Sequence, residues 1–126
     1  MKLSVQPDRL AVCQIPKRSP QDFTQANFWS LTCTPDETSL ILPEAEAQEH
    51  WVVEPGWRAL KVHGPLDFSL TGILAAIAQP LAQAGISIFA LSTYNTDYVL
   101  VKEIDLEKCK QALEQEGHTL YGMPTE

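Results

Sequence analysis

The order of apolar patterns between Trp57 and Tyr121 constrains the fold of this chain more than any other feature. Residues 57–62 have the period of two that is typical of a strand. A helical stripe follows, then two short apolar runs, a second helical stripe and a last short strand. This β-α-β-β-α-β order predicts an α+β, ferredoxin-like unit with two helices on one face of a four-stranded antiparallel sheet.

Residues that commonly begin and end helices bound the two predicted helices. Asp67 or Ser69 can cap the start of the first helix, and Gly85 and Gly117 follow the two helix ends as left-handed residues. Pro80 removes a backbone donor, so we expect a kink or a tightened last turn there. The two apolar stripes consist of Leu70, Ile73, Leu74, Ile77 and Leu81, and of Leu106, Cys109 and Leu113.

The N-terminal half has weaker patterns. They predict a strand over 10–15, a hairpin over 28–42, a short helix over 44–50 and a strand from 51 that Pro55-Gly56 ends. Its segment LTCTPDETSLIL resembles LSTYNTDYVLV of the other half, although any two hairpins look somewhat alike.

We interpret this similarity as a tandem repeat. Residues 1–56 form a degenerate N-terminal unit that has lost most of its first helix, and residues 57–126 form the complete unit. The two halves are expected to share one extended sheet.

The composition argues against nucleic-acid and membrane partners. Nine basic residues face 16 acidic ones, and the formal charge of −7 repels phosphate backbones. The apolar runs are too short to cross a bilayer, and none follows a basic N-terminal region. We therefore expect a cytoplasmic protein.

Catalytic motifs are absent from the sequence, so we predict no enzyme, metal or cofactor. No nucleophile elbow, cysteine-protease signature or phosphate loop is present. A meeting of Cys13 or Cys33 with a histidine in space stays open as an enzymatic alternative. The three cysteines, Cys13, Cys33 and Cys109, are expected at apolar-facing positions and lack metal-ligand spacing. The glutamates of residues 44–50 are expected on a solvated face; they are Glu44, Glu46 and Glu49.

Polar residues gather in two segments that join predicted elements. Residues 64–72 lead into the first helix, where free N–H groups can bind a carboxylate and Gly72 permits close approach of the backbone. Residues 92–97 supply three hydroxyl groups and the Asp97 carboxylate, which suit the ammonium and carboxylate groups of one small ligand. Simple helix caps and an ordinary hairpin turn are the alternatives.

At these segments, GPLDFSLTGILAAIAQPLAQAGISIFALSTYNTDYVLVKEIDL resembles ACT-domain proteins, especially small tandem ACT proteins related to the cytosolic arginine sensors. The resemblance implies a non-enzymatic regulatory protein that binds an amino acid between ACT modules. Leu70 occupies the place of a carboxylate in those sensors, so the resemblance leaves the identity of the amino acid open. This chain has two predicted units where those sensors have four, so the resemblance implies a homodimer. The implied ligand-binding residues are Asp67, Leu70, Thr71, Gly72, Ser87, Ile88, Thr93, Thr96 and Asp97. A protein-protein interaction module with a vestigial pocket is the alternative.

Overall fold

The computed structural model of the protein describes residues 1–17, 26–63 and 72–124. Contacts divide the chain into two units: unit 1 contains Met1–Pro7 and Arg58–Glu126, and unit 2 contains Asp8–Trp57. Strand β1 (Lys2–Ile15) begins in unit 1 and ends in unit 2, whereas β4 (Val52–Val62) begins in unit 2 and ends in unit 1. The first seven residues thus group with the C-terminal part of the chain.

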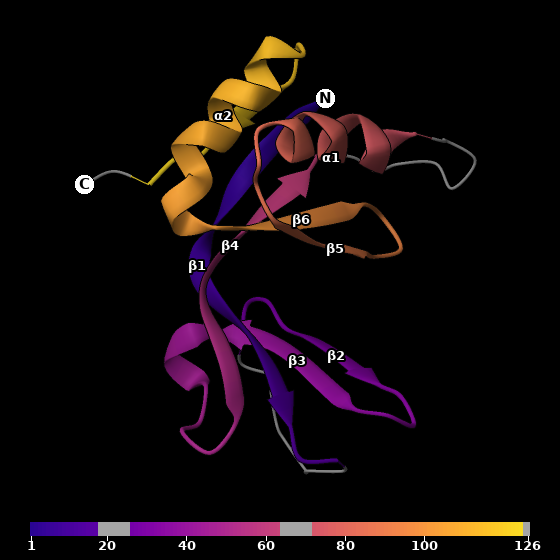
Figure 1. Ribbon diagram of the computed structural model, residues 1–126, viewed down its shortest axis with the longest axis vertical. Helices are drawn as coiled ribbons and strands as arrows, with labels where there is room; N and C mark the ends of the chain where they lie inside the picture. Colours follow the sequence, from indigo (N-terminus) through magenta and orange to yellow (C-terminus); the bar gives the residue numbers. More distant parts are fainter. Residues whose placement is uncertain (18–25, 64–71, 125–126) are drawn as a thin grey trace. The chain divides into compact units, whose positions relative to one another are not determined.

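From β4 to β7 unit 1 has the predicted β-α-β-β-α-β element order (Figure 1). The strand order within this unit is β7–β1–β4–β6–β5. After β4, its elements are α1 (Ile73–Gln83), β5 (Ile88–Ser92), β6 (Asp97–Lys102), the 3-10 helix η2 (Glu103–Asp105), α2 (Leu106–Gln115) and β7 (Thr119–Tyr121).

The predicted four-stranded, wholly antiparallel sheet of unit 1 is wrong in one respect. The start of β1 adds a strand, and its residues Lys2 to Ser4 pair in parallel with Thr119 to Tyr121 of β7. The added strand belongs there because Leu3 and Val5 alternate with polar residues and are 0% and 7% exposed. Strands β5 and β6 form the expected antiparallel hairpin.

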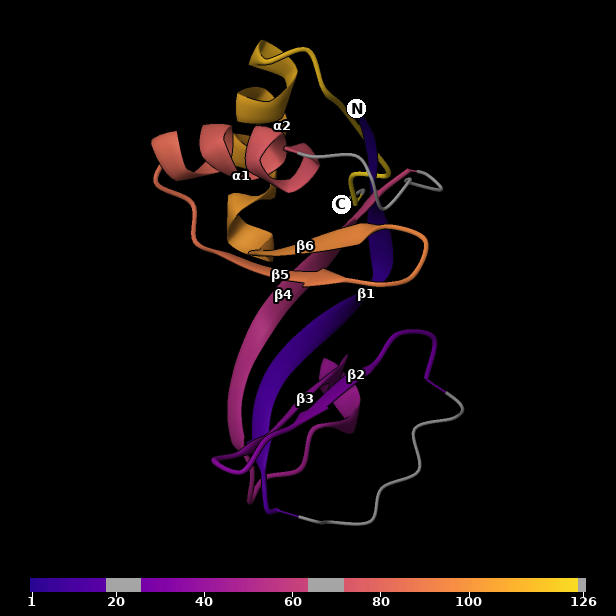
Figure 2. The ribbon, with the colours of Figure 1, turned by 90° about the vertical axis from the view of Figure 1, so that its right-hand side faces the viewer.

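The core of unit 1 lies between the sheet and the two helices, which cover the same face of the sheet (Figures 1 and 2). Every residue of the predicted second stripe is buried, as are Ile77 and Leu81 of the first stripe. Burial of these side chains is the main stabilising contribution to such a unit. The sheet strands contribute Leu3, Val5, Leu60, Val62, Val99, Val101 and Leu120 to this core.

Both helices end in the way that their glycines predict. The Gly85 N–H donates to the Ala82 carbonyl and the Ile86 N–H to the Leu81 carbonyl. This is the Schellman arrangement with a left-handed glycine, and Gly117 closes α2 in the same way. The last turn of α1 is therefore tightened, as expected beside Pro80.

The predicted cap of α1 is wrong. The N-cap residue is Gly72, with φ of 77° and no side-chain cap hydrogen bond, and the first helical residue is Ile73. The predicted caps Asp67 and Ser69 lie outside the described residues. The helix therefore begins later than its apolar stripe suggests.

Unit 2 contains β2 (Ser30–Cys33), β3 (Thr38–Pro43) and the 3-10 helix η1 (Glu44–Glu46), with strand order β2–β3–β1–β4. The predicted hairpin is confirmed, and the predicted helix over 44–50 is reduced to the single turn of η1. Most of residues 16–27, between the predicted strand over 10–15 and the hairpin, lie outside the described residues. The core of unit 2 consists of Ala11, Cys13, Ile15, Leu40, Leu42 and Trp51.

Pro55 and Gly56 do not end a strand, because β4 passes through both residues. Gly56 adopts a φ of 84°, which a residue with a Cβ rarely adopts. Its N–H donates to the Glu44 carboxylate at 2.9 Å. The predicted break is therefore a local irregularity in a continuous strand.

The two hairpins have the same turn. In unit 1 the Thr93 N–H donates to the Thr96 carbonyl. The Thr93 hydroxyl also donates to that carbonyl and accepts a hydrogen bond from the Thr96 N–H. In unit 2 Thr34 makes the equivalent contacts with Glu37. The two turns therefore have the same hydrogen-bond pattern, and the tandem repeat stays a prediction.

Candidate functional site

Three of the predicted ligand-binding residues, Asp67, Leu70 and Thr71, lie outside the described residues. Gly72 is exposed, and its left-handed backbone gives the chain its turn into α1. A Cβ at this position would meet no atom within 4 Å, so open space adjoins its backbone. The geometry is compatible with the close approach of another backbone or of a ligand.

The threonines of the β5–β6 turn have structural contacts. The Thr96 side chain is buried, and its hydroxyl donates to the Val62 carbonyl at the end of β4. The Thr93 hydroxyl donates to the Thr96 carbonyl at 3.0 Å. These bonds hold the turn against the end of β4, from which the polar segment 64–72 continues.

Asp97 begins β6 directly after this turn and is half-buried. Its carboxylate accepts a hydrogen bond from the Ser92 hydroxyl at 2.5 Å, across the residue pair that closes the β5–β6 ladder. Among residues 1–17, 26–63 and 72–124, no ion pair involves Asp97. The side chain is thus oriented by a neutral donor and keeps its negative charge available to a cationic group.

Ser87 and Ile88 lie where β5 begins. Ser87 is exposed, whereas the Ile88 side chain packs against the core of unit 1. In the strand order β5 is an edge strand, with β6 on one side. Its outer backbone N–H and C=O groups are of the kind that pair with a neighbouring strand, and the ligand-binding role of Ser87 and Ile88 stays a prediction.

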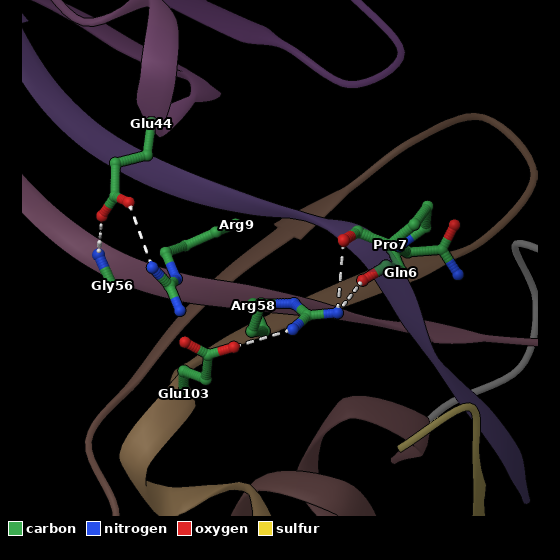
Figure 3. A network of polar contacts seen from close by, with 7 residues as sticks. All are labelled: Gln6, Pro7, Arg9, Glu44, Gly56, Arg58 and Glu103. Atoms are coloured by element: carbon green, nitrogen blue, oxygen red, sulfur yellow. Dashed lines mark hydrogen bonds and ion pairs between the residues drawn. The ribbon is translucent and has the colours of Figure 1, made fainter. Parts of the chain in front are cut away.

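Arg58 is a functional group that the sequence analysis missed. Its side chain is only 8% exposed, and Nη1 donates to Glu103 Oε1 at 2.9 Å (Figure 3). Nη2 donates to the carbonyl oxygens of Gln6 at 2.9 Å and Pro7 at 3.3 Å. The guanidinium therefore fixes the β6–η2 junction to β1 within unit 1. The sequence indicated this burial only through the position of Arg58, which shares the apolar face of its strand with Leu60.

Glu44 corrects the interpretation of the glutamates as a wholly solvated face. Besides accepting the Gly56 N–H, its carboxylate lies 3.7 Å from the Arg9 guanidinium (Figure 3). Glu46 and Glu49 are exposed, as expected. Glu44 is therefore a structural residue of unit 2, where it supports the irregular backbone at Gly56.

The three cysteines are free thiols, of which Cys13 and Cys109 are buried. Burial raises the pKa of the Cys13 thiol, so this thiol is a poorer nucleophile than an ordinary one at neutral pH. Burial and the Asp105 carboxylate raise the pKa of Cys109 to about 12, while Lys108 opposes the shift. Cys33 is exposed on β2, contrary to prediction, because β2 turns its side chains to solvent.

Among the same described residues no group of three His, Cys, Asp or Glu side chains could hold a metal ion. No helix in this part of the protein is long and apolar enough to span a membrane.

Comparison with known families identifies the fold. Residues 52–115 match the ACT domain family, and this range is half of the 126-residue chain. The protein belongs to the ACT domain family. The matched range contains β4 to α2, and hence Gly72, Ser87, Ile88 and the turn that ends at Asp97. Strands β1 and β7 lie outside the matched range.

Two human relatives share sequence with this ACT protein. CASTOR3P is 35% identical over 113 residues, which cover 79% of this chain and 69% of that protein. The cytosolic arginine sensor for mTORC1 subunit 1 is 33% identical over 113 residues, which cover 81% of this chain and 33% of the sensor. The chain therefore spans about a third of the length of that arginine sensor.

Solved structures agree with the ACT fold. A crystal structure of an Agrobacterium tumefaciens protein has a TM-score of 0.89 and 30% identity, and covers 99% of this chain and 96% of that one. The regulatory subunit of aspartate kinase from Thermus thermophilus has a TM-score of 0.64 at 13% identity, with 90% and 96% coverage. The second likeness is one of fold alone.

Proposed function

We propose that this protein is a non-enzymatic, amino-acid-binding regulatory protein that holds its ligand at an interface between ACT modules. The observation that carries the proposal is the Asp97 carboxylate, oriented by Ser92 and without an ion-pair partner in residues 1–17, 26–63 and 72–124. A carboxylate in this state can pair with the ammonium or guanidinium group of an amino acid. The sequence relation to a protein named as an arginine sensor supports this class of ligand.

The site that we propose needs a second module. Asp97 and the polar segment 64–72 supply one side, and the exposed start of β5, at Ser87 and Ile88, supplies backbone groups to a neighbouring module. The chain has one ACT match, so a homodimer is the simplest assembly that provides the neighbour. Ligand binding then stabilises the module interface by linkage. The protein would act in the cytoplasm, and these residues do not specify its downstream protein partner.

Calorimetry and thermal unfolding with each of the twenty amino acids test the proposal. A ligand at about 100 times its Kd stabilises the protein by about 2.7 kcal/mol, which is easily detected. Asp97→Asn keeps an acceptor for Ser92 but removes the charge, and we expect it to weaken binding at least about tenfold. Asp36→Asn, in the exposed turn of the other hairpin, is the matched control and should bind like the unmodified protein.

Three outcomes would contradict the proposal. A lack of response to all twenty amino acids at millimolar concentration would favour the alternative function, a protein-protein interaction module with a vestigial pocket. Equal binding by the Asp97→Asn and Asp36→Asn variants would remove Asp97 from the site. Unfolding of Asp97→Asn without ligand would make Asp97 a structural residue. Light scattering with and without the ligand tests the homodimer separately.

A further inference from the structure

A hollow on the helical side of unit 1 is lined by none of the predicted ligand-binding residues that the structure describes. One wall is a single face of α1 (Ile73–Gln83), and the other is the link between α2 and β7. Helices α1 and α2 contact one another, and both figures show them side by side (Figures 1 and 2). The residues that line the hollow are Ala76, Gln79, Pro80, Gln83, Glu116 and His118.

The hollow is rich in hydrogen-bond acceptors. Gln79 and Gln83 are exposed and lie one helical turn apart, so their side-chain amides share one face of α1. Glu116 adds a carboxylate from the opposite wall. The imidazole of His118 is already engaged, since its Nε2 lies 3.3 Å from the Ala76 carbonyl oxygen.

The groups beside the hollow include the C-terminal ends of two helices and one carboxylate. Both helices end beside it, at Gln83 and Gln115, and neither has a basic residue in its last turn. Each helix C-terminus is equivalent to roughly half a negative charge, which adds to the charge of Glu116. The amino nitrogen of Met1 lies 3.1 Å from His118 Nδ1 and offsets only part of this sum.

We propose that this hollow binds an ammonium group on an alkyl chain. The carboxylate of Glu116 would pair with the cation, the amide oxygens of Gln79 and Gln83 would accept its remaining protons, and Pro80 would contact the alkyl part. The cation comes either from a free amine or from a lysine side chain of a partner protein. This site is separate from the one at Asp97, and it does not depend on the proposed amino-acid binding.

Titration of the full-length protein with n-butylammonium chloride, followed by 1H–15N NMR, tests the site. We expect saturable shifts in the side-chain amides of Gln79 and Gln83 and in the backbone of Gly117. Glu116→Gln should weaken binding about tenfold, because a charge-assisted hydrogen bond is lost. Glu107→Gln, which removes an exposed charge from the first turn of α2, should change it less than twofold. 1-Butanol is the neutral control and should not saturate the site.

The source of the cation is distinguished by a blocked Gly-Lys-Gly peptide in the same experiment. Equal affinity for the peptide and for butylammonium supports the site with a free amine as the ligand. At least tenfold tighter binding of the peptide supports it with a protein lysine as the ligand. Shifts spread over the whole acidic surface, equal effects of the two glutamate variants, or saturation at Ser92 and Asp97 instead would overturn the proposal.

Discussion

The imidazole Nε2 of His118 lies 3.3 Å from the carbonyl oxygen of Ala76, in the middle of α1. That carbonyl would normally accept the N–H of the residue four positions later, which is Pro80 and has no N–H. His118, the residue directly before β7, supplies the missing donor. The cost of a proline inside a helix is thus offset by a side chain 38 positions later in the chain.

A double-mutant cycle tests this compensation. His118→Ala should lower the free energy of unfolding by about 1 kcal/mol, the net value of a typical hydrogen bond. In a Pro80→Ala background the helix has its own donor for Ala76, so the same substitution should cost less than half as much. Urea unfolding measures all four proteins. Equal costs in both backgrounds would show that His118 acts independently of Pro80.

Arg58 and Glu103 form the most buried ion pair that we describe, with side-chain exposures of 8% and 29%. Glu103→Gln removes one charge and leaves the guanidinium buried, so we expect a loss of about 1–3 kcal/mol in chemical unfolding. Glu114→Gln breaks the exposed pair with Lys110 and should cost less than about 0.5 kcal/mol. Similar losses in the two variants would mean that burial of Arg58 does not strengthen its pairing.

Thr96 is predicted to act on stability before any ligand binds. Thr96→Val has nearly the same shape but leaves the Val62 carbonyl without its hydroxyl donor, at a cost of about 1–3 kcal/mol. Thr96→Ser keeps the hydroxyl and should retain most of the stability. Thermal unfolding without ligand separates the variants. If Thr96→Val were as stable as the unmodified protein yet lost an amino-acid response, its hydroxyl would belong to the ligand site.

Cys109 predicts a loss of stability at alkaline pH. Its pKa of about 12 in the folded protein lies above the ordinary thiol pKa of 9.0, so the unfolded chain releases the proton first. The contribution of the protonated thiol is complete below pH 9.0 and is lost as pH rises toward about 12, at up to about 1.4 kcal/mol per pH unit.

Unfolding curves of the unmodified protein and of Cys109→Ala, measured between pH 8 and about 11, give the difference. The alanine variant should have the smaller decline, and the exposed Cys33→Ala should decline like the unmodified protein. Parallel curves for all three proteins would contradict the raised pKa.

Periodicity and helix-end residues predicted most of unit 1, because local rules determine these features. Leu106, Cys109 and Leu113 are buried at helical spacing, and Gly85 and Gly117 close their helices as left-handed residues. The strand at Lys2 was missed because Pro7 and Asp8 interrupt the apolar alternation before the predicted start at residue 10. Its position in the sheet depends on pairing with β7, more than 110 residues later, which no local pattern contains.

The candidate site was predictable only in part, for a similar reason. The sequence indicated Asp97 and its hydroxyl neighbours, but not that the Thr96 hydroxyl is used by Val62. Arg58 and Glu103 are 45 positions apart, so their pairing follows from the fold and not from spacing. The contact of the Glu44 carboxylate with the Gly56 N–H was missed because the two residues are 12 positions apart and only the fold brings them together.

The pairing of Lys2 to Ser4 with β7 makes unit 2 an insertion within unit 1. The sheet of unit 1 cannot be complete until β7 has been synthesised, although the start of β1 is synthesised before unit 2. Unit 2, from Asp8 to Trp57, is contiguous and has its own core, so it can form earlier during synthesis. A fragment of residues 57–126 would lack the strand between β4 and β7, and it should expose an unpaired edge and aggregate.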